Sequence, residues 1–139
     1  MRKLVLIGSL LASLLPSLFW GTSAFADSAY NVKIDAPAVK KAQKGVAKIH
    51  IAPGTGFHVN KDYPTTVSVV APTGITVDKP KQTAKDAVKL AEEGADFDVA
   101  FTTTDSGKKL FTGELKFAVC SANSCDPKKE KLSFTVDVN

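Results

Sequence analysis

Cys120 and Cys125 are the residues of this 139-residue chain whose type and spacing could support chemistry, and the chain has no other cysteine. Four residues, Ser-Ala-Asn-Ser, separate them. On either side of the pair, apolar and polar residues alternate, from Leu115 to Val119 and from Leu132 to Val138. This period of two is typical of half-buried strands. We therefore predict two antiparallel strands joined by a short polar loop, with one cysteine at each end of the loop.

Thiol–disulfide exchange is the chemistry that this arrangement favours. Opposite residues of two antiparallel strands lie at a separation that a disulfide tolerates. Closing so small a loop contributes about 2 kcal/mol in the chain-entropy estimate, which is low for a disulfide. A local, accessible disulfide exchanges readily with a partner thiolate. We interpret the pair as a redox-active centre, and a structural clasp in a non-catalytic binding domain is the alternative.

The flanking residues bear on which sulfur reacts. Cys120 is out of phase with the apolar residues Leu115, Phe117 and Val119, which places its side chain on the opposite face of the strand. After Cys125 come several lysines that would favour a thiolate, and one aspartate that would oppose it. These residues are Lys128, Lys129, Lys131 and Asp126. The sequence therefore gives no preference for either cysteine as the attacked sulfur.

Other chemistries have weaker support. His50 alternates with apolar neighbours, which indicates a solvent-facing or hydrogen-bonded side chain. His58 follows a turn cluster and could join the two cysteines as a metal ligand, but the three residues have no recognisable ligand spacing. A Gly-x-Ser-x-Gly turn and a Cys-x-x-Cys-His haem motif are both absent from the sequence. We expect no metal and no cofactor.

The N-terminal segment predicts export. A basic start at Arg2 and Lys3, an apolar run from Leu4 to Trp20 and the sequence Ala24-Phe25-Ala26 describe a cleavable secretory signal over residues 1–26. The mature protein would then be one domain, residues 27–139, located in the periplasm without membrane insertion. An oxidising compartment allows the cysteines to pair. With 16 basic and 14 acidic side chains left, scattered along the chain, a nucleic-acid surface has little support.

Short apolar runs separated by glycine and proline predict an all-β fold. Ala47, Ile49 and Ile51 alternate with polar residues, as do Phe97, Val99 and Phe101. Turn clusters break the chain near residues 53–56 and 72–74. About seven or eight strands in a single sandwich domain fit this rhythm. The segment 82–94 fits either a short helix with Thr83 and Asp86 as a capping box or an extended connection.

Several segments together resemble the N-terminal periplasmic domain of the DsbD thiol:disulfide interchange protein. They are Gly56-Phe57-His58-Val59-Asn60, Pro64-Thr65-Thr66-Val67, the run from Gly113 to Cys120, and Cys125-Asp126-Pro127. The resemblance covers most of the chain from about residue 45 onward, and the cysteine hairpin is its most specific element. It implies an immunoglobulin-like β-sandwich in which Cys120 and Cys125 match the redox-active pair. We also expect a monomer whose partners are thiol or disulfide proteins of the cell envelope.

Overall fold

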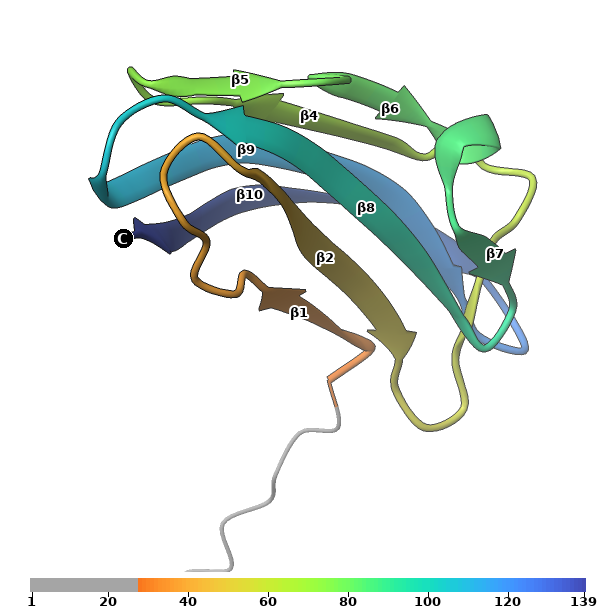
Figure 1. Cartoon of the computed structure of the whole chain (residues 1–139). Coiled ribbons are helices and arrows are strands. Elements are labelled where there is room, and N and C mark those ends of the chain that lie inside the picture. Colours follow the sequence, from red (N-terminus) through yellow and green to blue (C-terminus); the bar gives the residue numbers. More distant parts are fainter. Residues whose placement is uncertain (1–27) are drawn as a thin grey trace, which may run out of the picture.

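The structure, a computed structural model, describes residues 28–139 (Figure 1). The predicted signal segment, residues 1–26, lies outside the described residues. The described chain forms ten strands and one short 3-10 helix. These are β1 (Tyr30–Asp35), β2 (Lys44–Pro53), β3 (His58–Val59), β4 (Thr66–Val70), β5 (Ile75–Val77), β6 (Lys81–Thr83), η1 (Ala84–Asp86), β7 (Lys89–Ala91), β8 (Gly94–Thr103), β9 (Gly107–Cys120) and β10 (Cys125–Val138).

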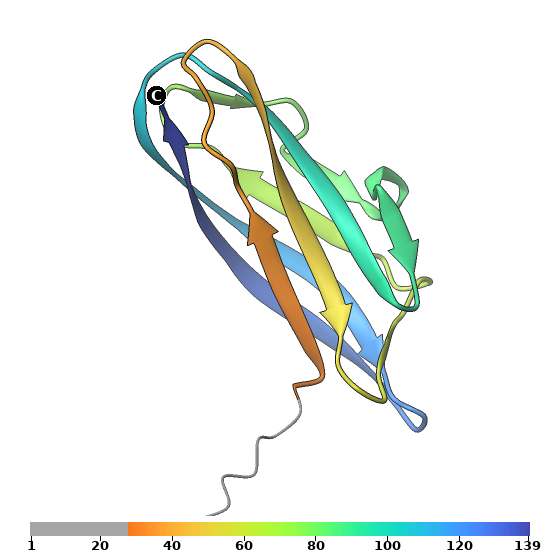
Figure 2. The same ribbon diagram turned by 60° about the horizontal axis from the view of Figure 1, so that its bottom comes forward.

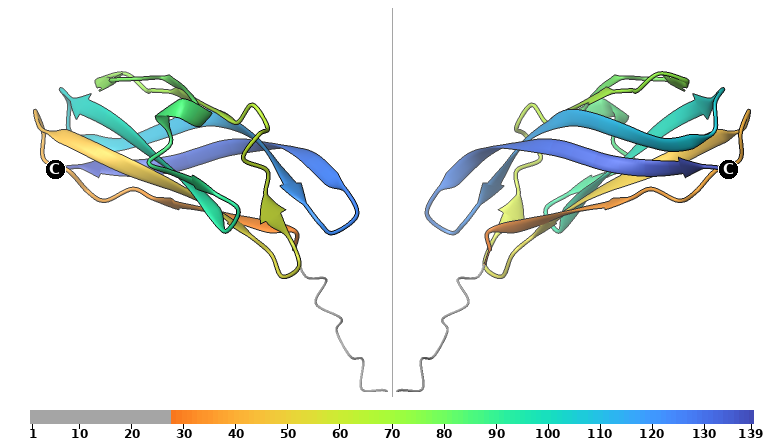
Figure 3. Two further views of the ribbon diagram at one scale, coloured as in Figure 1. Left: turned by 90° about the vertical axis from the view of Figure 1, so that its right-hand side faces the viewer. Right: turned by 90° about the vertical axis from the view of Figure 1, so that its left-hand side faces the viewer.

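Two five-stranded antiparallel sheets face each other, as the edge-on views in Figure 3 show. The first sheet has the order β1-β2-β8-β5, and β7 pairs with the other end of β8. The second has the order β10-β9-β4-β6, and β3 pairs with the end of β9. This arrangement confirms the predicted all-β, immunoglobulin-like sandwich. The strands of only two or three residues carry too little alternation to be counted from sequence.

The core lies between the sheets because each long strand turns every second residue inward. Ile49, Phe97 and Phe101 of the first sheet are buried, as the alternation predicts. Phe101 meets Phe111 of the second sheet at a ring-centroid distance of 5.2 Å, and Phe111 stacks on Phe134 at 4.8 Å. The Phe101–Phe111 contact joins the two sheets, and the Phe111–Phe134 stack lies within the second sheet.

The segment 82–94 combines both conformations that the sequence allows. Thr83 and Asp86 form the predicted capping box, with the Thr83 backbone N–H donating to the Asp86 carboxylate at 2.8 Å. The helix that follows is a single 3-10 turn, and β7 then adds an extended segment. Upstream of the turn, buried Gln82 donates from its side-chain amide to the Asp98 carbonyl at 2.9 Å and so links the two sheets.

The β9–β10 hairpin is the longest local element of the fold. Both strands have 14 residues and pair along their whole length. Its turn projects at the end of the sandwich far from the C-terminus, as Figures 2 and 3 show. β10 is an edge strand, where the missing N–H of Pro127 is tolerated. Within residues 28–139, no helix is long and apolar enough to cross a membrane.

Candidate functional site

The two cysteines form a disulfide across the tip of the β9–β10 hairpin. Cys120 is the last residue of β9, Cys125 is the first residue of β10, and the two are directly opposite in register. Their Cα atoms lie 3.9 Å apart. Ser121 donates its backbone N–H to the Ser124 carbonyl at 2.8 Å, which closes the turn next to the bond. The predicted loop and its flanking cysteines are therefore confirmed, and the bond joins strands that already pair by themselves.

The two sulfur-bearing residues differ in solvent exposure. Cys120 retains only 3% of its surface, whereas Cys125 is exposed. Cys120 lies between two neighbours, because β3 pairs with β9 on one side and β10 on the other. Cys125 begins an edge strand and has a neighbour on one side only. An approaching thiolate therefore meets Cys125 more easily than Cys120.

Burial of Cys120 refines the predicted side-chain direction. Leu115, Phe117 and Val119 are buried in the core, so Cys120 does lie on the opposite, outer face of β9. This end of the outer face is nevertheless closed, because Ala118 is buried there as well. The alternation of apolar and polar residues in β9 predicts that the Cys120 side chain points to the outer face. It does not predict that this outer face is itself buried near Cys120.

His58 is the residue that the fold brings next to the disulfide. β3 pairs with β9 so that Val59 is opposite Val119 and His58 is opposite Cys120. Val59 is fully buried in the core, so His58 and Cys120 both lie on the outer face. The three residues His58, Cys120 and Cys125 thus form a row across β3, β9 and β10. With both sulfurs in a disulfide, neither is a thiolate ligand for the metal site considered from sequence.

Local structure holds His58 in this position. Gly56 has a φ of 78° and is the third residue of a turn closed by the Phe57 N–H and the Gly54 carbonyl at 3.0 Å. Glycine takes this conformation without a steric cost. Beyond the turn, the Val59 N–H donates to the Glu92 carbonyl at 2.8 Å, and the Asn60 N–H donates to the Ala118 carbonyl at 2.9 Å. β3 is short, but it is fixed on both sides.

A shallow polar pocket of about 270 Å³ lies beside the disulfide. Its side chains come from the β3 segment, from the turn between β7 and β8, and from the hairpin. The residues are His58, Val59, Asn60, Lys61, Asp62, Glu92, Cys120 and Cys125. Lys61 and Glu92 form an ion pair at 3.5 Å across the pocket. The site thus offers a polar contact surface around the bond.

The lysines after Cys125 are largely engaged with carboxylates. Lys128 forms an ion pair with Asp126, and its ammonium lies 5.9 Å from the centre of the Tyr30 ring. Lys129 contacts Glu114 at 2.9 Å, and its hydrogen bond, aided by Lys116, lowers the pKa of Glu114. The positive charge of the lysines, which would favour a thiolate at Cys125, is therefore partly neutralised by neighbouring carboxylates such as Asp126.

Tyr30 joins the β1 edge to the hairpin near the site. Its hydroxyl donates to the Glu130 carboxylate, and its ring meets Phe117 edge-on at 4.9 Å. The hydrogen bond to Glu130, together with burial, raises the pKa of Tyr30 to about 12. This contact fixes the edge strand β10 against the opposite sheet without touching the disulfide.

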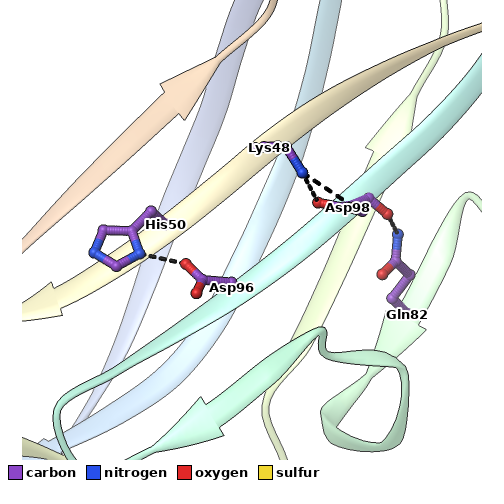
Figure 4. A network of polar contacts seen from close by, with 5 residues as sticks. All are labelled: Lys48, His50, Gln82, Asp96 and Asp98. Carbon is purple, nitrogen blue, oxygen red and sulfur yellow. Dashed lines mark hydrogen bonds and ion pairs between the residues drawn. The ribbon is translucent and has the colours of Figure 1, made fainter.

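The outer face of the first sheet carries a second polar cluster, shown in Figure 4. His50 contacts Asp96 through Nδ1, and Lys48 contacts both carboxylate oxygens of Asp98 at 3.1 and 3.3 Å. A pocket of about 360 Å³ lies over these pairs. Its lining residues are Lys33, Asp35, Lys48, His50, Val88, Asp96 and Asp98, which include no serine, threonine or cysteine nucleophile. His50 is thus hydrogen-bonded and exposed, as its sequence position indicates.

No protein-family model matches the chain, and no curated protein matches its sequence. Among solved structures, AggA, the major subunit of aggregative adherence fimbriae type I from Escherichia coli, aligns with a TM-score of 0.43 and 7% identity over 81% of this chain and 97% of that chain. WR4, a C. elegans MSP family member, aligns with a TM-score of 0.41 and 9% identity over 78% of this chain and 97% of that chain. Domains 4 and 5 of the S-layer protein SbsC align with a TM-score of 0.42 and 14% identity, over 78% of this chain but only 44% of that chain. At these TM-scores and identities, the alignments give no information on function.

Proposed function

We propose that this chain is an exported thiol–disulfide exchange module of the periplasm, related to the N-terminal domain of DsbD as its sequence motifs suggest. The Cys120–Cys125 disulfide would be its redox-active centre. Its partners would be thiol or disulfide proteins of the cell envelope, and it would act as a monomer without a cofactor. The observation that carries the proposal is a disulfide with one exposed and one buried cysteine, placed at the end of a hairpin that is paired without it.

The hairpin supports exchange because its structure does not depend on the bond. The two strands pair over 14 residues each, and the Phe111–Phe134 stack anchors their far halves in the core. A bond that closes so small a loop contributes about 2 kcal/mol at most in the chain-entropy estimate. Both the oxidised and the reduced form can therefore keep the same fold, which an exchange protein needs.

The difference in exposure determines which sulfur a partner attacks. A partner thiolate attacks the Cys125 sulfur, a new partner–Cys125 disulfide forms, and the electron pair of the broken bond goes to the Cys120 sulfur. A second partner thiolate then attacks the partner sulfur of this mixed disulfide and releases Cys125 as a thiolate. The partner dithiol is oxidised to a disulfide, and the Cys120–Cys125 bond is reduced by two electrons.

A redox titration of the purified, oxidised protein tests the proposal. Thiol alkylation in dithiothreitol buffers would report the fraction reduced, and circular dichroism would report the fold at each point. We expect equilibration at a potential well above about −300 mV, the value below which structural disulfides are found, with the β-sheet spectrum unchanged. A bond that is reduced only when the domain unfolds would contradict exchange. It would instead support the alternative, a binding or structural domain with a clasp.

A further inference from the structure

We infer that His58 donates the proton that the Cys120 sulfur takes up when the disulfide opens. The inference rests on the proposed function and adds a residue to its chemistry. His58 lies opposite Cys120 across the β3–β9 pairing, and directly opposite residues on one face have Cβ atoms roughly 4.5–5.5 Å apart. The imidazole therefore stands on the side of Cys120 that faces away from Cys125.

The need for a proton donor follows from the burial of Cys120. Attack at exposed Cys125 makes Cys120 the leaving sulfur, so negative charge develops at a residue that retains only 3% of its surface. Burial disfavours a thiolate and makes it a poorer leaving group, unless a cation or proton donor is close. An imidazole is well suited to this role, because it ordinarily exchanges its proton between pH 5 and 8.

The other charged groups of the pocket are less suited to this role. Lys61 is engaged with Glu92 at 3.5 Å, on the side of β3 where the β7–β8 turn packs. Asp62 and Glu92 are the carboxylates that line the pocket, and Glu92 is the partner of Lys61. On the hairpin, Asp126 and Lys128 pair with each other, and they are in register with Val119 and Phe117, on the opposite face of β10 from Cys125. His58 is therefore the group opposite the leaving sulfur that can both carry and release a proton.

The step balances as a substitution coupled to a proton transfer. The partner thiolate forms its bond to the Cys125 sulfur, the Cys120–Cys125 bond breaks, and its electron pair stays on Cys120. The imidazolium of His58 gives its proton to this sulfur, which leaves a neutral imidazole and a neutral thiol. In the reverse direction, neutral His58 accepts the proton and restores the Cys120 thiolate, which attacks the mixed disulfide and closes the bond.

The pH dependence of disulfide reduction in a His58→Gln variant tests this inference. The rate with dithiothreitol would be measured from pH 5 to 9 in the complete protein and divided by the thiolate concentration of the reagent. For the wild type we expect this rate constant to be highest at low pH and to fall as the imidazole loses its proton. For His58→Gln we expect a flat profile, roughly tenfold slower at pH 5.5 and nearly equal to the wild type at pH 9.

A His50→Gln variant is the matched control, because this second histidine lies on the outer face of the other sheet and contacts Asp96. It should keep the wild-type profile, and circular dichroism and thermal unfolding should show that both variants fold. Equal rates and equal profiles for His58→Gln and the wild type would overturn the inference and leave the proposed function intact. A folded wild-type protein whose disulfide resists dithiothreitol at every pH would overturn both.

Discussion

Each sheet of the sandwich carries one histidine on its outer face, and the two histidines differ in what lies opposite them. His50 on β2 pairs in register with Asp96 and contacts its carboxylate. His58 on β3 pairs in register with Cys120 of the disulfide. The residue type and the kind of face are the same. The neighbour across the strand therefore differs: it is a carboxylate that contacts the histidine in one sheet and a disulfide in the other.

The surroundings of the two histidines sharpen the contrast. Near His50, the Lys48–Asp98 pair belongs to strands β2 and β8 in the middle of the first sheet, and its side chains are exposed to solvent. Near His58, Cys120 is buried and a polar pocket opens beside the bond. Exposed charge pairs contribute little to stability. A disulfide beside an open pocket can be reached by a thiolate, so under the proposed function the second region is the one expected to react.

The largest expected effect distinguishes the two sulfurs of the disulfide near His58. Cys120→Ser leaves the exposed Cys125 thiol, which should form mixed disulfides with oxidised glutathione and with envelope proteins. Cys125→Ser leaves the buried Cys120 thiol, which should form them at least about tenfold more slowly because access limits exchange. Mass spectrometry of the intact proteins would count the adducts over time.

The outcome of this trapping experiment also bears on the role of His58. Similar yields for both variants, or a faster reaction at Cys120, would contradict the assignment of Cys125 as the attacked sulfur. His58 would then stand beside the attacked sulfur rather than the leaving one. Unfolding of both variants in urea, followed by fluorescence or circular dichroism, would show whether either thiol is exposed by loss of structure.

A smaller effect is expected at Tyr30, which holds the hairpin edge but does not touch the disulfide. Tyr30→Phe removes the hydrogen bond to Glu130 and should lower the free energy of unfolding at pH 7 by about 1 kcal/mol. Because the pKa of Tyr30 is raised to about 12 in the folded state, its contribution is complete below pH 10 and is lost as pH rises toward 12. Wild-type stability should therefore fall over this range more steeply than that of Tyr30→Phe.

Urea unfolding at pH 7, 10 and 11.5 would measure the free energy of unfolding of the wild type and of Tyr30→Phe. Taking the difference between the two proteins removes the effect of lysine titration, because both contain the same lysines. A difference that stays constant from pH 7 to 11.5 would contradict the role of the Glu130 contact. The rate of disulfide reduction at pH 7 should be equal in both proteins, because Tyr30 stabilises the frame of the site and not its chemistry. A slower rate in Tyr30→Phe would mean that the Tyr30–Glu130 contact also affects the reactivity of the disulfide through the hairpin.

Local features of the fold could be predicted from the sequence. The alternation around Ile49, Phe97 and Phe117 identifies the core faces of the long strands, and the spacing of the cysteines fits the hairpin between them. Thr83 and Asp86 are three residues apart, so their capping box was also visible. In each case the interacting groups are neighbours in the chain, and the local periodicity or spacing fixes their geometry.

The row of His58, Cys120 and Cys125 could not be derived in the same way. β3 has two residues, too few for alternation, and it pairs with a strand about sixty positions further along the chain. The burial of Cys120 has the same origin, because it depends on a neighbour that only the tertiary fold supplies. Sequence reasoning grouped these three residues as potential metal ligands, but it gave neither their order across the strands nor the asymmetric exposure of the sulfurs.

The smallest effect is expected in the first sheet, at the Lys48–Asp98 pair. The pair has ideal length at 3.1 Å, but the two side chains retain 62% and 38% of their surface. A double-mutant cycle with Lys48→Gln and Asp98→Asn should therefore give a coupling energy of about 0.5 kcal/mol, which shrinks at 1 M salt because the charges are screened. In all three variants the disulfide should be reduced at the wild-type rate, since the pair lies on the opposite sheet.

A coupling energy above about 1.5 kcal/mol, or a changed reduction rate, would mean that this face does more than carry exposed charge. The contrast between the two histidine regions would then have to be abandoned.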